Sequence, residues 1–283
     1  MVGATQHDGI SDKDYEFIRK FVYEQSRINL GPDKKELVSA RLAKRLRAIG
    51  LNSYTEYCDY LQSASGKDEV TNLVDSISTN HTYFFREIKH FEFLNDVILP
   101  HWLQNSFRKG DTNFNIWSAA SSSGEEPYSL GILLQEVLQH HPSASWTLDG
   151  TDISTRMLDL ARRGIFEQDR LRDVKPEWMR RYFQKGVGQW EGHFRAKEVI
   201  RNRLTFHHVN LLQERYPFSK HFHVIFCRNV MIYFDRATQE QLVAKLTEQL
   251  HPKGYLIVGH SESLMGIKHS LDSVRPSIYR RRD

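Results

Sequence analysis

The sequence predicts an α/β protein in which a small helical domain precedes a mainly parallel sheet with helices on both faces. Three observations lead to this fold class. Residues 11–80 repeat apolar side chains at helical spacing, and from residue 114 onward short apolar runs alternate with amphipathic helical segments. A glycine-containing stretch between residues 163 and 204 interrupts that alternation and predicts an inserted subdomain.

The predicted domains follow these changes of pattern. A helical N-terminal domain covers residues 11–80, a linker and helix cover residues 81–100, and the α/β domain covers residues 101–283. Within the α/β domain, a small inserted β-subdomain spans about residues 176–203. Strands are expected near residues 114–118, 146–151, 204–209, 222–227 and 255–260, and helices near residues 127–140, 154–163 and 236–250.

One segment of the helical domain is strongly basic. Residues 32–50 are expected to form a helix, because Pro32 stands at its first turn and Gly50 lies just past its end. An apolar stripe falls on one face of this helix. Its remaining surface carries four cations, which are Arg41, Lys44, Arg45 and Arg47. They predict either a solvated helix surface or a docking site for an acidic partner.

Composition narrows the classes of protein that this chain can belong to. Its 283 residues, 40% hydrophobic and 26% charged, predict a folded core. The only cysteines are Cys58 and Cys227, and no histidine or cysteine cluster has metal-ligand spacing, so neither a disulfide framework nor a metal site is expected. Neither an export signal nor a run of about 18 apolar residues occurs. We therefore expect a cytoplasmic protein without membrane insertion.

The most informative segment follows the first expected strand. Residues 117–129, WSAASSSGEEPYS, form a loop of very small side chains that leads into a helix. Dinucleotide folds place glycines here so that the backbone can approach a pyrophosphate. Because Ala and Ser replace two of these glycines, a nucleoside without a pyrophosphate fits better. S-adenosylmethionine (SAM) is the common cofactor of that kind, and an NAD-linked oxidoreductase is disfavoured.

A second informative residue, Asp152, ends the second expected strand. A carboxylate at this position can accept hydrogen bonds from both hydroxyls of a ribose. It can also cap the helix that begins near Ser154. Both interpretations stay open at this point.

Four motifs near the strand ends carry a family resemblance. They are STNHTYFFRE at residues 78–87, WSAASSSGEEPYS at 117–129, NLL at 210–212 and FCRNVMIYFD at 226–235. The order and approximate spacing of these motifs resemble those of the CheR family of chemotaxis receptor methyltransferases. The resemblance runs from about residue 11 to residue 279 and includes the basic helix and residues 259–262. The resemblance implies SAM-dependent methylation of glutamate side chains on the cytoplasmic helices of chemoreceptors. The implied products are glutamate methyl esters and S-adenosylhomocysteine.

The resemblance also implies site residues. Those implied to bind the cofactor are Asn80, Thr82, Arg86, Glu126, Asp152, Asn210, Leu211, Arg228 and Asn229. Arg86, Arg228 and Tyr233 are implied to position the reacting groups. No general base is expected, because a glutamate with a pKa of about 4.3 is already an anion at neutral pH. Each of these residues also has a purely structural interpretation. The arginines can form structural ion pairs, Glu126 can be an acid favoured in the first turn of a helix, and Tyr233 can pack in the core.

Partner recognition is predicted at two places. Receptor methylation helices are rich in acidic and amide residues, so the face that carries Arg41, Lys44, Arg45 and Arg47 suits the cytoplasmic domain of a chemoreceptor. In part of the family, the inserted subdomain binds a peptide at the receptor's C-terminus by strand addition. The segment from Gly186 to Gly192 resembles that region, and its sequence leaves open whether the peptide is bound here.

Two rival functions stay open. A SAM-dependent methyltransferase of RNA would need a broader basic face with exposed aromatic residues, so no nucleic-acid partner is expected. A catalytically silent adaptor would keep the fold in order to bind receptors. Any SAM-dependent turnover would exclude that adaptor.

Overall fold

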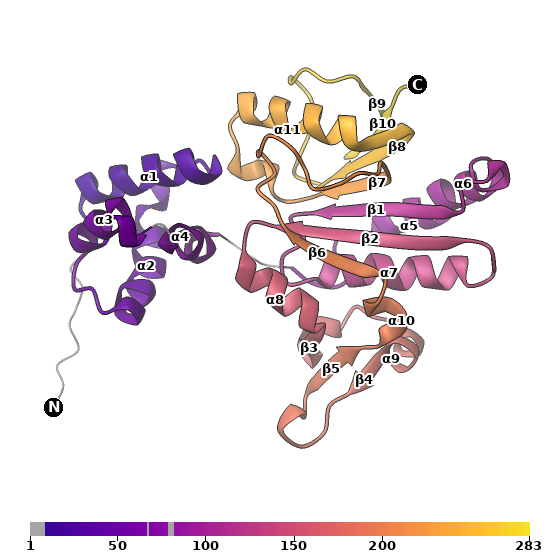
Figure 1. The fold of residues 1–283 in the computed structure, drawn as a ribbon, viewed down its shortest axis with the longest axis horizontal. Helices are drawn as coiled ribbons and strands as arrows, with labels where there is room; N and C mark the ends of the chain where they lie inside the picture. Colours follow the sequence, from indigo (N-terminus) through magenta and orange to yellow (C-terminus); the bar gives the residue numbers. More distant parts are fainter. Residues whose placement is uncertain (1–8, 67, 79–81) are drawn as a thin grey trace. The chain divides into compact units, whose positions relative to one another are not determined.

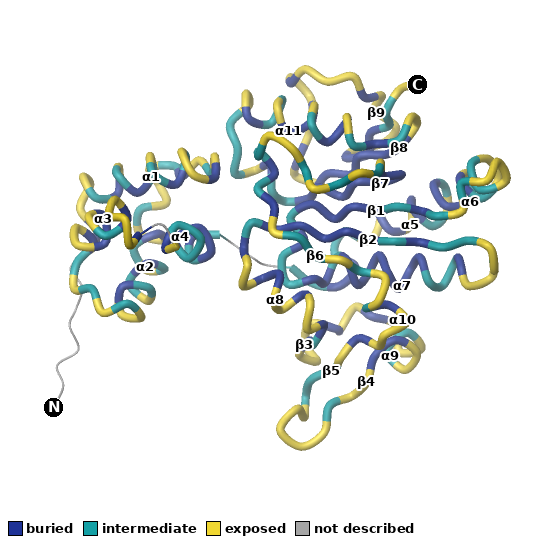
Figure 2. Tube along the Cα trace, in the orientation of Figure 1, coloured by how far each residue is buried: buried dark blue, intermediate teal, exposed yellow. Residues whose placement is uncertain are grey.

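The computed structural model describes residues 9–66, 68–78 and 82–283. The chain divides into two compact units, residues 1–79 with 233–238 and residues 80–232 with 239–283. Each unit has its own buried core, which Figure 2 marks along the chain. Within the described ranges, no helix is both long enough and apolar enough to cross a membrane.

The first unit is helical, as the sequence predicts (Figure 1). Its helices and short 3-10 turns are α1 (Asp12–Ser26), η1 (Pro32–Lys34), α2 (Lys35–Ile49), α3 (Tyr54–Gln62), η2 (Ala64–Gly66) and α4 (Glu69–Ile77). Ser11 caps α1 by accepting a hydrogen bond from the N–H of Asp14. Gly50 follows α2 in the left-handed conformation, with a φ of 74°. Leu42 and Tyr57 are among the fully buried side chains of its core.

A mainly parallel sheet forms the centre of the second unit. Its strand order, over the described residues, is β6-β2-β1-β7-β8-β10-β9. The strands are β1 (Asn113–Ala119), β2 (Ser145–Asp152), β6 (Leu204–His208), β7 (Phe222–Cys227), β8 (Leu250–Val258), β9 (Leu271–Arg275) and β10 (Ile278–Arg281). β10 runs antiparallel to both neighbours, whereas the other pairs are parallel. The predicted α/β fold class is confirmed.

Helices precede, connect and cover these strands. They are α5 (Ile88–Phe93), the π-helical turn η3 (Leu94–Ile98), α6 (Leu99–Gln104), α7 (Glu125–Leu138), α8 (Thr155–Arg163) and α11 (Arg236–Gln249), with the short turns η4 (Phe107–Lys109) and η7 (Met231–Tyr233). Every residue of β7 is buried, as is typical of a parallel strand covered on both faces. In Figure 2, β1 and β2 are also buried over most of their length but begin with residues of intermediate exposure.

The inserted subdomain carries a second sheet, with the order β3-β5-β4. Its elements are β3 (Ile165–Glu167), η5 (Gln168–Leu171), α9 (Pro176–Tyr182), β4 (Phe183–Lys185), η6 (Gly188–Trp190), β5 (His193–Ala196) and α10 (Glu198–Arg201). The edge strand β3 precedes the boundary expected near residue 176. Three residues are too few to show the alternation by which a strand is recognised in a sequence.

Candidate functional site

The carboxyl ends of the central strands lie level with one another. Ala119 of β1 pairs with Thr151 of β2 and with Cys227 of β7. Cys227 in turn pairs with Val258 of β8. The strand order reverses at β1, and ligands of open α/β sheets bind at such a switch point, beyond the carboxyl ends of the strands. The loops after these strands therefore form the candidate site.

The loop between β1 and α7 allows a ligand to approach the backbone closely. Ala120, Ser122 and Gly124 have φ values of 64°, 48° and 103°, so the chain turns sharply through left-handed conformations. The hydroxyls of Ser121 and Ser122 are buried and find no hydrogen-bond partner among the described residues. Buried polar groups are normally hydrogen-bonded. Two unsatisfied hydroxyls in one strand-end loop therefore fit a bound polar molecule.

Asp152 ties this loop to the end of β2. Its side chain is buried, with Oδ2 accepting from the N–H of Ser122 at 2.8 Å and Oδ1 accepting from the N–H of Ser154 at 2.9 Å. Ser154 itself caps α8 by accepting from the N–H of Met157. An ionised carboxylate has about four acceptor positions. The bonds to Ser122 and Ser154 occupy two of these positions and hold the carboxylate beside the loop after β1.

The loop after β6 lies against the end of β2. The N–H of Val209 donates to the carbonyl of Asp152 at 3.0 Å. The next residue, Asn210, is half-buried, and its Oδ1 accepts from the N–H of Leu212 at 3.0 Å. Leu211 is buried. The structure thus brings Asp152, Asn210 and Leu211 to one edge of the sheet.

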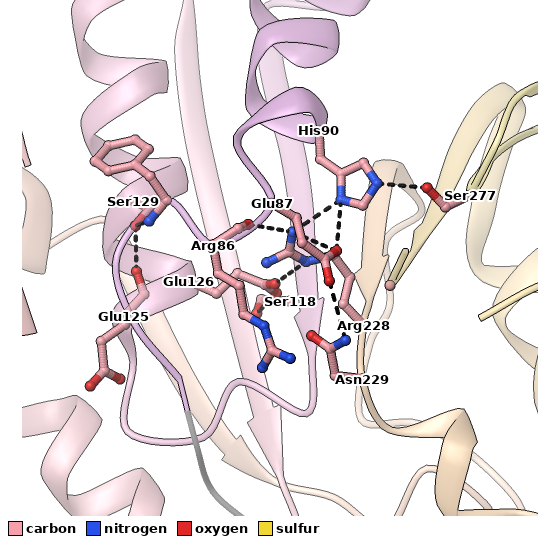
Figure 3. A network of polar contacts seen from close by, with 12 residues as sticks. Arg86, Glu87, His90, Ser118, Glu125, Glu126, Ser129, Arg228, Asn229 and Ser277 are labelled. Atoms are coloured by element: carbon pink, nitrogen blue, oxygen red, sulfur yellow. Dashed lines mark hydrogen bonds and ion pairs between the residues drawn. The ribbon is translucent and has the colours of Figure 1, made fainter. Parts of the chain in front are cut away.

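A buried guanidinium organises the other half of the site (Figure 3). The side chain of Arg228, directly after β7, is only 3% exposed. Its Nε donates to Glu126 at 2.7 Å, and one terminal nitrogen donates to the carbonyl of Arg86 at 2.7 Å and to Nδ1 of His90 at 3.0 Å. Ser118 donates to the second oxygen of Glu126 at 2.6 Å. Nε and one terminal nitrogen of Arg228 are therefore engaged in hydrogen bonds to other protein groups.

Glu87 joins the segment before α5 to the ends of two strands. Its backbone is left-handed, with a φ of 60°. One carboxylate oxygen lies 3.5 Å from Arg228 and accepts from the N–H of His260 at 3.2 Å. The other oxygen accepts from the side-chain amide of Asn229 at 3.3 Å. The segment that carries Arg86 is thereby held to the loops after β7 and β8.

His90 is a neutral member of this network. Its Nδ1 accepts a hydrogen bond from Arg228, so Nε2 carries the proton and donates to the hydroxyl of Ser277, 2.7 Å away. Burial, helped by the charge of Arg228 and the nearby His260, lowers the pKa of His90 to about 3. His90 is consequently uncharged at neutral pH.

Glu87, His90 and His260 also form a group of potential metal ligands. Their ligand atoms lie within 4.8 Å of one another. The guanidinium of Arg228, however, lies 3.0 Å from the ring of His90 and 3.5 Å from the carboxylate of Glu87. This permanent positive charge repels a cation and engages the lone pair of His90 that a metal would need. We therefore assign the three residues to the polar network.

The start of α7 and the segment before α5 are linked by an arginine. Glu125 is buried and accepts from Ser123 at 2.7 Å and from Arg170 at 3.2 Å. The same nitrogen of Arg170 donates to the carbonyl of Thr82 at 2.9 Å, and Thr82 is half-buried. Asn80, the other residue of this segment implied to bind the cofactor, lies outside the described residues.

Two further predicted residues are only partly exposed. Arg86 is half-buried, and Figure 3 shows its side chain directed away from the guanidinium of Arg228. Its guanidinium carbon lies 5.9 Å from the centre of the Tyr83 ring. Tyr233 is half-buried at the end of η7. The catalytic roles of Arg86, Arg228 and Tyr233 stay predictions.

Sequence reasoning missed three members of this network. Glu87 is the last residue of the motif at residues 78–87, which carries part of the family resemblance, so its place in that motif could have indicated a site residue. His90 and Ser277 had none, because a single histidine or serine outside a motif carries no signature of its partners.

In the helical unit, the four predicted receptor-binding cations have two kinds of environment. Arg45 contacts both carboxylate oxygens of Glu69, with one donor distance of 2.6 Å, and the side chain of Glu69 is 3% exposed. Arg41 donates to a backbone carbonyl of α4. Both therefore support the packing of α2 on α4. Lys44 and Arg47 are exposed.

Comparison with known proteins identifies the class that this fold and site define. Residues 80–279 match the protein family described as "CheR methyltransferase, SAM binding domain". The second unit is therefore a SAM-dependent methyltransferase domain with a Rossmann-like sheet. Residues 13–78 match the family described as "CheR methyltransferase, all-alpha domain".

Relatives over nearly the whole chain agree with this class. The chemotaxis protein methyltransferase of Borreliella burgdorferi is 40% identical over 263 residues, which cover 93% of this chain and 92% of the relative. Those of Salmonella typhimurium and Escherichia coli are 35% and 34% identical over 279 residues, covering 99% of this chain and 93% and 94% of the relatives. The chain belongs to the CheR methyltransferase family, and it carries out SAM-dependent methylation in chemotaxis.

Proposed function

We propose that this chain methylates glutamate side chains on the cytoplasmic helices of chemoreceptors, forming glutamate methyl esters and S-adenosylhomocysteine. Family membership across both units is the observation that carries the proposal. The relatives are named for chemotaxis, in which a receptor is the natural acceptor. The residues at the strand ends also support the proposal.

The residues at the strand ends fit the cofactor. Bound there, SAM supplies a methyl group on a positively charged sulfur. We infer that Asp152 accepts from the ribose hydroxyls, that Asn210 and Leu211 hold the adenine, and that the unsatisfied hydroxyls of Ser121 and Ser122 face the bound molecule. These assignments use an acid, an amide and an apolar side chain in the roles that their chemistry allows.

Glu126 is suited to the amino-acid end of the cofactor. Arg228 and Ser118 each occupy one position on its carboxylate, which leaves acceptor capacity for an ammonium group. The buried guanidinium also fixes the direction of the carboxylate, because two side chains hold its two oxygens. We therefore infer that Arg228 positions Glu126 and the backbone of Arg86 without touching the acceptor.

The acceptor needs no general base. A glutamate with a pKa of about 4.3 reaches the site as an anion, so no proton moves during transfer. His90 is unsuited to the role of base, since its pKa is about 3 and both of its ring nitrogens are hydrogen-bonded. Orientation of the two reactants and exclusion of water are what the protein contributes.

Receptor recognition is proposed at two surfaces. Lys44 and Arg47 are exposed on α2. Their positive charges complement an acidic receptor helix, which would raise the rate of association and fix the register in which the helix docks. In the inserted subdomain, a cavity of about 310 Å³ is lined by Val187 and Trp190, which are 81% and 47% exposed. A receptor C-terminal peptide added to an edge of this small sheet would cover both side chains.

The test is incubation with methyl-labelled SAM and a receptor cytoplasmic fragment, followed by mild alkali. A glutamate ester releases labelled methanol, and a fragment whose acceptor glutamates are replaced by alanine serves as the control. The proposal would be overturned by label on the fragment that resists alkali. It would also be overturned by label that enters added RNA while the receptor fragment stays unlabelled. Receptor binding without any transfer would identify a silent adaptor.

A further inference from the structure

A buried acid outside the predicted site bridges the loops after β7 and β8. Glu262 is 6% exposed. One of its carboxylate oxygens accepts from the N–H of Gly259 at 2.6 Å and of Asn229 at 2.8 Å, and the other accepts from the N–H of Met231 at 2.8 Å. The hydrogen bonds that hold this carboxylate thus come from the backbone.

These contacts join two neighbouring strand ends. Cys227, at the end of β7, pairs with Val258, at the end of β8, so the two loops leave the sheet side by side. Gly259 allows them to close on one another. A Cβ at this position would lie 2.6 Å from the side-chain nitrogen of Asn229 and 2.9 Å from the carboxylate of Glu262. The sequence therefore leaves space at residue 259 for this junction.

The backbone after β7 needs such support. Asn229 has a φ of 58°, a left-handed conformation that residues other than glycine adopt at a cost. A left-handed residue turns neighbouring N–H groups toward one side and forms a concave site for an anion. Glu262 provides that anion from within the chain, and it binds the N–H groups on both sides of Val230.

The residues fixed in this way belong to the candidate site. Arg228, which holds Glu126, directly precedes the anchored turn. The side chain of Asn229 donates to Glu87. A shift of the turn therefore moves both the guanidinium and the amide.

We propose that Glu262 is a positioning residue for methyl transfer, in which its carboxylate fixes residues 229–231 and thereby the placement of Arg228 and Asn229. The kinetic part of this inference rests on the proposed function. The structural part is independent of the acceptor, because the hydrogen bonds are made within the chain.

The test is the variant Glu262→Gln. Glutamine keeps the size and one acceptor oxygen, but its amide nitrogen is a donor and faces backbone N–H groups. We expect kcat per S-adenosylhomocysteine-binding site to fall roughly tenfold to a hundredfold, because charge-assisted bonds to the turn are lost. Calorimetric titration gives the number of binding sites, so loss of folded protein is separated from loss of turnover. The peptide that covers residues 228–232 should exchange its amide hydrogens faster.

Two further variants make the result decisive. Glu240→Gln is the matched control, since Glu240 accepts the backbone N–H of Lys268, which lies outside residues 229–231; its kcat should equal that of the wild type. Gly259→Ala disturbs the same junction from the other side and should lower kcat in the same way, which keeps the proposal testable even where Glu262→Gln does not fold.

Wild-type kcat per binding site and unchanged exchange in Glu262→Gln would overturn the inference. Where that variant does not fold, wild-type kcat in Gly259→Ala would overturn it. If the wild-type chain methylates no receptor glutamate, the proposed function fails, and the exchange comparison still tests whether Glu262 holds the turn.

Discussion

Replacing His90 by glutamine should make the second unit less sensitive to acid. His90 is almost fully buried, and its two ring nitrogens contact Arg228 and Ser277. Protonation would place an N–H on the atom that now accepts from Arg228, so the bond would be lost and two positive charges would meet. Glutamine is neutral at every pH and cannot make this transition.

The magnitude follows from the pKa of His90, which is about 3 in the folded chain against an ordinary value of 6.5. Since the folded state lowers the pKa, protons bind preferentially to the unfolded state. Stability is therefore retained above about pH 6.5 and lost as the pH falls toward 3. Each pH unit within that window corresponds to about 1.4 kcal/mol, so between pH 7 and pH 5.5 the wild type should lose about 1.3 kcal/mol through His90 alone.

Urea unfolding followed by tryptophan fluorescence measures this effect. All five tryptophans lie in the second unit, so the signal reports that unit. His223 and His251 also have lowered pKa values because of burial, and they contribute to the acid sensitivity of both proteins equally. The difference between wild type and His90→Gln isolates His90. Equal losses in the two proteins between pH 7 and pH 5.5 would refute the reasoning.

Three further predictions concern the cofactor, the network and the helical unit. Asp152→Asn should raise the Kd for S-adenosylhomocysteine by roughly tenfold in calorimetry, because a charge-assisted acceptor is lost; an unchanged Kd would remove Asp152 from the cofactor site. Arg228→Lys keeps the charge but not the planar donor geometry that holds Glu126, so turnover should fall by roughly tenfold or more, and wild-type turnover would contradict this. Arg45→Met removes the cation that pairs with the buried charge of Glu69, while the hydrogen bonds from Tyr57 and Asn72 remain. It should destabilise the helical unit by roughly 2–4 kcal/mol in urea unfolding followed by circular dichroism. The exposed Lys44→Ala is its control, and equal stability of the two variants would refute the pairing.

The parallel core could be predicted because its strands are continuous apolar runs between turn signals. Residues 222–227 are buried throughout, and the expected strand coincides with β7. The edge hairpin of β9 and β10 could not be predicted in the same way. In β9 only Leu271 is buried, which leaves no alternation in the sequence to detect.

The candidate site shows a similar division. The clustering of Asp152 and Arg228 beyond the strand ends could be predicted, because the topology of a parallel sheet gathers the residues that follow its strands. Their roles in binding come from the family resemblance and stay predictions. The histidine partner of Arg228 could not be predicted, since His90 lies 138 positions before it and meets it only in the fold. The same holds for Ser277, which contacts His90 across 187 positions. On α2, periodicity does not distinguish Arg45, whose partner lies on another helix, from the exposed Lys44.

The central claim is that methyl groups are transferred to glutamate carboxylates of a receptor. Tandem mass spectrometry of a receptor cytoplasmic fragment, after reaction with SAM carrying a deuterated methyl group, tests it most directly. We predict deuterated methyl esters on glutamate side chains of the methylation helices, formed by the wild type and strongly reduced with Arg228→Lys. Label on lysine or another nitrogen, or an unlabelled fragment from an enzyme that binds S-adenosylhomocysteine, would contradict the account.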